Sequence, residues 1–232
     1  MITLRKANER GYSKLNWLES YHSFSFSDYF DPDHMGFSSL RVINEDLVVP
    51  DGGFPTHSHR DMEIITYVLS GKLEHKDSMG NTSIIEPGDT QRMSAGRGVT
   101  HSEYNASSYE PVHFLQIWIT PSLISIEPSY EQKNIPSALK RGGLKLIASN
   151  DGSQDSVIIH QDVKIYTSLL DHGEEIEFSA HDDRSVYIHL AKGGINVNGN
   201  ELTKGDGAKI TNEATINIVC IDSAEFLLFD LP

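Results

Sequence analysis

The stretch that decides the fold of this chain is FPTHSHRDMEIITYVLSG, from Phe54 to Gly71. It carries two histidines one residue apart, His57 and His59, followed by the run from Glu63 to Leu69. That run is rich in β-branched and aromatic residues, which is typical of a strand. Side chains at positions i and i+2 of a strand point to the same face. We therefore expect both imidazoles to face one point.

A second pair of the same kind ends the stretch PGDTQRMSAGRGVTHSE, residues 87–103. Here His101 and Glu103 are one residue apart, and Gly96 and Gly98 before them let the backbone bend sharply. Two such pairs on neighbouring strands would aim four ligands at one point. Three imidazoles and a carboxylate suit a divalent Fe, Ni, Cu, Mn, Co or Zn ion. The spacing predicts a metal site with open coordination positions, which is where metal chemistry takes place.

We treat the histidines outside these two pairs as single residues. A single histidine on a strand is more often a hydrogen-bonded core or surface residue than a metal ligand. We therefore predict ordinary structural positions for the remaining eight: His22, His34, His75, His113, His160, His172, His181 and His189.

Composition limits the classes of function. The chain has 232 residues, with 33 acidic against 19 basic side chains and a formal net charge of −14. With no Lys/Arg cluster longer than two, direct binding to nucleic acid is not expected. The single cysteine, Cys220, excludes an intramolecular disulfide. We find neither an apolar signal segment nor a window of transmembrane length, so we expect a cytoplasmic protein that binds no membrane.

Short strands and turns alternate along most of the chain from Leu40 onward, which indicates barrels or sandwiches. Residues 121–137 interrupt this rhythm with three prolines, and we interpret them as a crossing between two domains, with short helical turns near Pro136 to Lys140. The stretch from Leu190 to Ile210 parallels the stretch from Leu69 to Met93 in its spacing of turns and strands. We therefore predict an all-β chain of two barrels with few short helices: residues 1–133 with the metal site and residues 134–232 without metal ligands.

The motifs carry a family resemblance. The H-x-H pair with Glu63 after it, then P-G-D and G-x-G-x-x-H, resembles the two metal motifs of the cupin superfamily. Together with SFSFSDYFDPDHMGFSSLRVINED, residues 23–46, the text resembles pirins, most closely the bacterial pirin-like proteins described as quercetin dioxygenases. The resemblance is strong over the first 120 residues and weak over the rest. It implies a bicupin of two jelly-roll barrels and one divalent ion, iron before Ni, Cu, Mn, Co or Zn, held by His57, His59, His101 and Glu103.

The resemblance leaves two candidates for the carboxylate. In most cupins it follows the histidine pair closely, which is Glu63 here, and in pirins it follows the last histidine, which is Glu103. Residues 57, 59, 61 and 63 would share a face of an unbroken strand, so Glu63 also qualifies. We favour Glu103 as ligand and as the base that takes a proton from substrate. Glu63 then lies behind the ligands, where it orients an imidazole or takes a proton.

The implied reaction is the opening of a flavonol such as quercetin by dioxygen, with release of carbon monoxide. Two alternatives stay open: an iron-dependent, redox-sensing regulator that binds a partner protein, and a cupin enzyme for another enolic compound. Oxygen consumption with a flavonol separates them. We expect a monomer, because a second barrel can cover the surface that single-barrel cupins bury in dimers.

Overall fold

The computed structural model describes all residues from Met1 to Pro232, and nearly all of its regular structure is β-strand. Its only helical segments are three short 3-10 turns: η1 (Ala7–Glu9), η2 (Ser137–Lys140) and η3 (Ser153–Asp155). None of them has the length and apolar character that crossing a membrane would require. The predicted all-β fold is confirmed, and η2 falls on the helical turns expected near Pro136.

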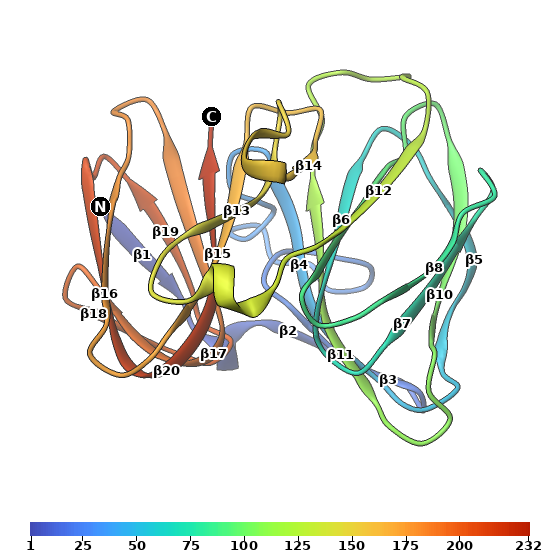
Figure 1. Cartoon of the computed structure of the whole chain (residues 1–232), viewed down its shortest axis with the longest axis horizontal. Helices are drawn as coiled ribbons and strands as arrows, with labels where there is room; N and C mark the ends of the chain where they lie inside the picture. The colour runs from blue at the N-terminus through green and yellow to red at the C-terminus, as the bar shows by residue number, and fades with distance from the viewer. The chain divides into compact units, whose positions relative to one another are not determined.

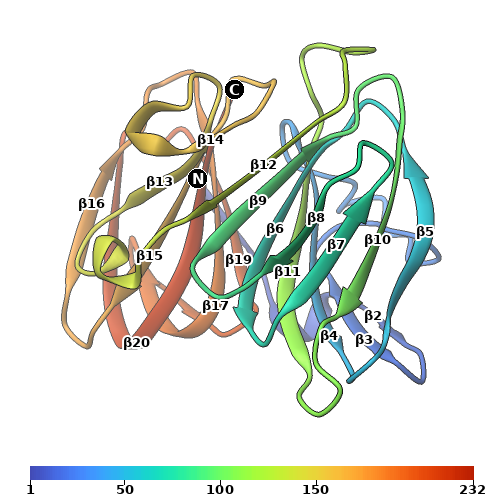
Figure 2. The same ribbon diagram turned by 45° about the vertical axis from the view of Figure 1, so that its right-hand side comes forward.

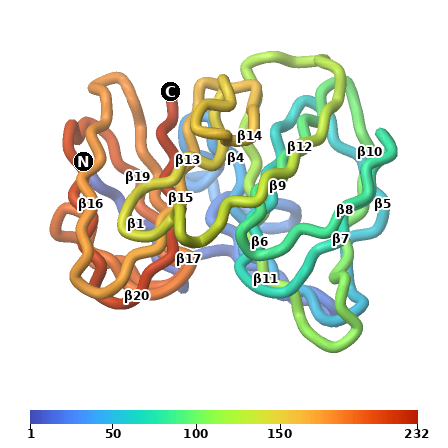
Figure 3. The backbone as a smooth tube through the Cα atoms, viewed as in Figure 1, coloured from blue at the N-terminus to red at the C-terminus, as the bar shows by residue number.

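The chain divides into two compact units. The first unit comprises Gly11–Asn134 and Val157–Gln161, and the second comprises Met1–Arg10, Ile135–Ser156 and Asp162–Pro232. A single division after residue 133 would place two segments differently. Val157–Gln161 belongs to the first unit, and Met1–Arg10 belongs to the second. The N-terminal segment does so because β1 (Ile2–Arg5) pairs antiparallel with β19 (Gly207–Thr211). The tube in Figure 3 shows this blue segment among the orange and red strands of the second unit.

The first unit consists of two antiparallel sheets (Figure 1). The strands of the larger, seven-stranded sheet are, in spatial order, β12 (Ser129–Asn134), β9 (Asp89–Ser94), β6 (Glu63–Ser70), β11 (Val112–Ile119), β4 (Leu40–Val48), β3 (Leu18–His22) and β2 (Gly11–Lys14). The strands of the four-stranded sheet are, in spatial order, β5 (Gly53–His59), β10 (Val99–Asn105), β7 (Leu73–Asp77) and β8 (Thr82–Ile85). Figure 2 shows β5, β10 and β7 side by side. The unit also includes the short β14 (Val157–Ile158).

The two sheets of the first unit pack face to face over a mixed interior. One part is an apolar core with residues from both sheets: Leu18, Val48, Val68, Leu73, Ile85, Val112 and Phe114. Beside it, Gln91, Thr66 and Gln116 stand opposite one another on β9, β6 and β11. Thr66 and Gln116 hydrogen bond to Glu103 of the four-stranded sheet, so this polar row faces the interior. The row places amides and hydroxyls where the candidate site lies.

The second unit is a single antiparallel sheet system with an apolar interior. Its strands run in the order β1, β19, β17 (Ser185–Val197), β20 (Thr215–Leu231), β15 (Lys164–Leu170) and β13 (Lys145–Ser149), while β16 (Glu175–Ser179) pairs with β20 and β18 (Asn200–Thr203) pairs with β17. The strands β17 and β20 are long, and they pair with each other over most of their length. Register shifts around Lys192 allow this, helped by Gly193 at φ +77, where a Cβ would lie 1.9 Å from the carbonyl oxygen of Ser223.

The interpretation of residues 121–137 as a crossing was wrong in one part, because β12 lies inside this segment. The strand pairs with β9 at the edge of the seven-stranded sheet. Its sequence, SYEQKN, lacks alternating apolar residues. Polar contacts hold the strand in place: Arg92 pairs with Glu131 at 3.1 Å, and Gln132 donates to Asp89 at 2.9 Å. An edge strand held in this way leaves no hydrophobic pattern to detect.

Candidate metal centre

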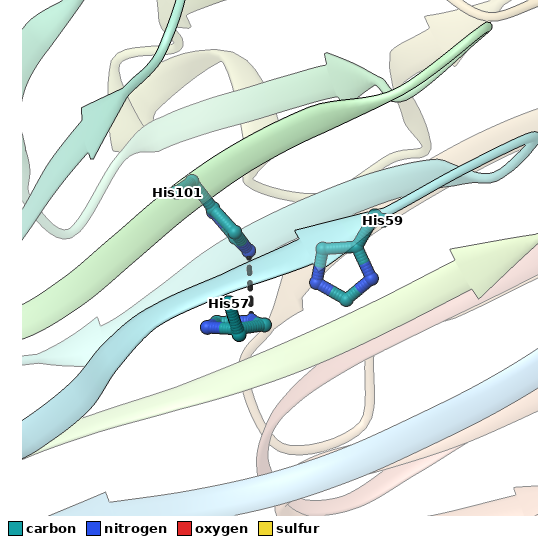
Figure 4. A group of neighbouring side chains, drawn as sticks. All are labelled: His57, His59 and His101. Atoms are coloured by element: carbon teal, nitrogen blue, oxygen red, sulfur yellow. Dashed lines mark hydrogen bonds between the residues drawn. The ribbon is translucent and has the colours of Figure 1, made fainter.

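Three imidazoles converge between β5 and β10. His57 stands directly opposite His101 in the antiparallel pair, and His59 stands opposite Val99. Figure 4 shows His57 and His59 from β5 and His101 from β10 turned toward one another. The Nε2 atoms of His57 and His101 are 3.0 Å apart, and the ligand nitrogens of all three residues lie within 4.8 Å of one another.

The geometry of these imidazoles fits a metal ion. His57 Nδ1 lies 2.8 Å from the carbonyl oxygen of Pro55, which can only accept a hydrogen bond, so Nδ1 carries the proton and Nε2 the lone pair. That lone pair faces His101 Nε2 across 3.0 Å. Two neighbouring ligands at right angles, each about 2.1 Å from an ion, are separated by about 3.0 Å. The pair therefore already has the spacing of two adjacent ligands.

Burial and neighbouring imidazoles keep His59 and His101 neutral. Burial, with smaller contributions from the neighbouring imidazoles, lowers the pKa of His59 to about 4. Burial, followed by the proximity of His57 and His75, lowers the pKa of His101 to about 3. Both rings are unprotonated near neutral pH, so a metal ion would not have to displace a proton from either of them.

Glu103 lies next to these imidazoles in an overlapping group. The register of β10 against β5 shifts between His101 and Glu103. The Glu103 carboxylate is buried, and potential ligand atoms of Glu103, His101 and His75 lie within 4.8 Å of one another. Both of its oxygens accept from the amide nitrogen of Gln116, at 2.9 and 2.8 Å, and Thr66 donates to one of them at 3.5 Å. The seven-stranded sheet thus holds this carboxylate beside the histidines.

Glu63 lies away from the cluster. His57 and His59 are on β5 and Glu63 begins β6, so the unbroken strand that would place them on one face does not exist. Glu63 is three residues before the inward-facing Thr66 and therefore faces the opposite side of β6. Its carboxylate accepts from Ser94 Oγ at 2.9 Å and from the backbone of His160 at 3.2 Å, and His160 Nδ1 lies 3.3 Å away. The structure does not bring Glu63 to a ligand imidazole.

Two residues of the cluster escaped the sequence reasoning. His75 Nδ1 lies 3.5 Å from His101 Nδ1, and His75 Nε2 lies 3.2 Å from the Asp77 carboxylate. Both side chains are fully buried. A detectable signal existed, because Leu73, His75 and Asp77 alternate on β7 with the same period of two as the recognised pairs.

Gln116 was also missed, although it is the one amide in the apolar strand VHFLQIWI. Next to it on the same face of β11, the Trp118 ring lies edge-on to His59, with ring centroids 5.0 Å apart. Trp118 also packs beside the apolar cluster of Ile64, Met93, Ala95 and Val99. A surface hollow of about 520 Å³ includes His59 in its lining, together with Ser58, Arg60, Ser78, Gly98, Val99 and Thr100. The site therefore has an apolar wall and a polar opening.

Comparison with known proteins identifies the family. The family model described as Pirin matches residues 3–119. The chain belongs to the pirin family. A second model, described as the quercetinase C-terminal cupin domain, matches residues 146–231 of this pirin. The predicted bicupin architecture is confirmed.

The relatives of this pirin match it over its whole length. The Escherichia coli protein named quercetin 2,3-dioxygenase is 47% identical over 232 residues, covering 100% of this chain and 99% of the relative. A Pseudomonas aeruginosa protein named putative quercetin 2,3-dioxygenase is 39% identical over 233 residues and is covered completely, as is this chain. The crystal structure of the Escherichia coli bacterial pirin YhhW in complex with nickel(II) is 46% identical, with a TM-score of 0.96 over 100% of this chain and 99% of that one.

Proposed function

We propose that this pirin binds one divalent transition-metal ion through His57, His59, His101 and Glu103, and opens flavonols such as quercetin with dioxygen. The observation that carries the proposal is the pair of Nε2 atoms 3.0 Å apart, with the lone pair of His57 fixed toward His101. The names of the relatives and the nickel(II) complex of a bacterial pirin support the choice of reaction and of a metal.

In the proposed reaction the imidazoles and Glu103 have different roles. The three imidazoles would hold the ion, and the hydrogen bond to Pro55 keeps His57 in the required tautomer. A bound divalent ion would supply Lewis acidity, which lowers the pKa of the 3-hydroxyl of a flavonol, and open coordination positions. Glu103, held by Gln116, accepts the proton of that hydroxyl at a carboxylate oxygen. Dioxygen is the oxidant, and one ring carbon leaves as carbon monoxide.

The surroundings of His59 suit a flat aromatic substrate. Trp118 packs edge-on against His59. It also forms a T-shaped pair with Phe26, with ring centroids 5.3 Å apart. Aromatic and apolar walls of this kind bind planar ligands and keep water from the reacting centre. We infer that the flavonol rings lie along this wall while the polar 3-hydroxyl and carbonyl point to the histidines.

The test is turnover with quercetin, measured as oxygen consumption and carbon monoxide release. Protein would be reconstituted in parallel with Fe(II), Ni(II), Mn(II), Co(II) and Cu(II), with iron as the proposed native metal. We expect His101→Ala to lose metal and turnover together, and Glu103→Gln to lose turnover more than metal. His113→Gln is the matched control, because His113 pairs with Glu45, which belongs to neither group of candidate metal ligands.

Each outcome separates one part of the proposal. Full metal stoichiometry in His101→Ala would refute the ligand assignment, and unchanged turnover in Glu103→Gln would remove Glu103 as the base. Tight metal binding without turnover would refute the flavonol reaction. From the sequence we further propose a monomer that acts in the cytoplasm, of which size-exclusion chromatography tests the first part.

A further inference from the structure

A line of buried polar side chains continues behind His101, away from His57. His101 Nδ1 faces His75 Nδ1 at 3.5 Å, and His75 Nε2 faces the Asp77 carboxylate at 3.2 Å. The side chains of His75 and Asp77 are both fully buried. Water therefore cannot substitute for these contacts, and the protein groups themselves decide where the protons lie.

Asp77 anchors the line because the turn after β7 fixes its carboxylate. Its oxygens accept from the backbone of Met79 at 2.9 Å and from the backbone and amide side chain of Asn81 at 3.0 and 2.8 Å. Three N–H groups donate to this carboxylate, so the turn holds Asp77 as a hydrogen-bond acceptor. A carboxylate can only accept, so His75 Nε2 carries a proton toward Asp77.

This order determines the tautomer of His101. With its proton on Nε2, a neutral His75 offers a lone pair at Nδ1, which accepts a hydrogen bond from the Nδ1–H of His101. The Nε2 atom of His101 then has a lone pair and faces the lone pair of His57 Nε2 at 3.0 Å. Two lone pairs at this distance repel each other, and a cation between them removes the repulsion. The opposite tautomer would donate from His101 Nε2 to His57 Nε2 and close the site to a cation.

We propose that His75 and Asp77 are positioning residues that hold His101 in the tautomer open to the metal, and that His75 is not itself a ligand. The inference rests on the proposed metal site. It also chooses between the two overlapping groups of candidate ligands, because His75, His101 and Glu103 form the second one. An ion bound to that second group would need His101 Nδ1, which already donates its hydrogen bond to His75.

The first test needs no substitution. In protein loaded with diamagnetic Zn(II), nitrogen NMR of the histidine rings distinguishes protonated, unprotonated and metal-bound nitrogens. We expect the metal at His101 Nε2, a proton at His101 Nδ1, a proton at His75 Nε2 and an unprotonated, metal-free His75 Nδ1. A metal-bound His75 nitrogen, or a proton at His101 Nε2, would overturn the inference.

The second test measures Zn(II) affinity by competition with a chelator. His75→Leu removes the acceptor and should weaken binding about 10–100-fold, as is typical when a group that orients a ligand is lost. His75→Asn, whose amide oxygen can accept from His101, should recover part of the loss. His113→Leu controls for loss of a partly buried histidine that pairs with a carboxylate, Glu45. Affinity unchanged in His75→Leu, or lost equally in His75→Asn, would refute a positioning role.

These readouts separate this inference from the proposed function. The expected nitrogen pattern without flavonol turnover would support the inference and refute the reaction. Turnover with a metal-bound His75 nitrogen would support the reaction and refute the inference. Failure to bind Zn(II) or any other divalent metal would refute both.

Discussion

The contact between Gln116 and Glu103 yields the prediction that depends most directly on the structure. The Gln116 amide nitrogen donates to both oxygens of a carboxylate that is 2% exposed, and Gln116 is itself 7% exposed. Water cannot replace this donor. Substitution with leucine keeps a similar volume and removes the donor, so the buried charge would retain only the longer contact from Thr66 at 3.5 Å.

The size of the effect follows from the cost of an uncompensated buried charge. Leaving a buried polar group without its partner costs about 1–3 kcal/mol, and more when the group is charged, so losing this shared donor should lower the free energy of unfolding by about 2–4 kcal/mol. For a chain of this length that corresponds to a decrease in Tm of roughly 5–15 °C. A divalent ion bound beside Glu103 would compensate the charge, so added metal should reduce the difference from wild type.

The assay is thermal unfolding of metal-free protein, repeated with Ni(II). Gln91→Leu is the matched control, because Gln91 stands in the same row across β9, β6 and β11 and its side-chain oxygen has no hydrogen-bond partner. Gln116→Leu should unfold well below Gln91→Leu without metal and approach it with metal. If both variants unfold at the same temperature without metal, Gln116 does not stabilise the Glu103 charge.

Two further predictions concern pH and the second carboxylate. Because the folded protein lowers the pKa of His59 to about 4 and of His101 to about 3, the unfolded chain takes up protons below about pH 6.5 that the folded chain does not. The free energy of unfolding of metal-free protein, measured by chemical denaturation, should therefore fall between about pH 6.5 and 4, and less steeply in His101→Ala; equal slopes would contradict this. Glu63→Gln, which weakens the contacts to Ser94 and His160, should lower stability by about 1–3 kcal/mol and leave metal affinity unchanged; weaker metal binding would mean that Glu63 acts on the ligands.

The fold was predictable where strands are buried on at least one face. The run from Glu63 to Leu69 and the strand from Val112 to Ile119 carry the expected residues and occur in the structure as β6 and β11. The sequence did not predict β12, whose stability comes from Arg92 and from Asp89 on β9 rather than from apolar burial. Edge strands of this kind are specified by partners far along the chain.

The candidate site was predictable only as far as local spacing reaches. The period of two identified His57, His59 and His101 because each is one residue from a second potential ligand. His75 and Asp77 on β7 carry the same period of two, but our prediction treats them as single residues. Nothing local connects Gln116 to the histidines, since it comes from β11 and meets the site only after both sheets have formed. For Gln116 the available sign was a lone amide within an apolar strand, and single residues of that type are usually structural.

The choice between Glu63 and Glu103 shows what decides such a case physically. From the sequence both carboxylates lie within reach of the histidine pairs, and an unbroken strand would have placed Glu63 on their face. The chain instead turns after His59, with Asp61 at φ 48 and its backbone nitrogen bonded to the carbonyl of Gly96, and β6 begins in the other sheet. Because side chains alternate between the two faces of a strand, Glu63 lies on the opposite face of β6 from Thr66. It therefore points away from the imidazoles and toward Ser94. Glu103 continues β10, the strand of His101, and lies within 4.8 Å of ligand atoms of His101 and His75, which is why we propose it as the carboxylate ligand.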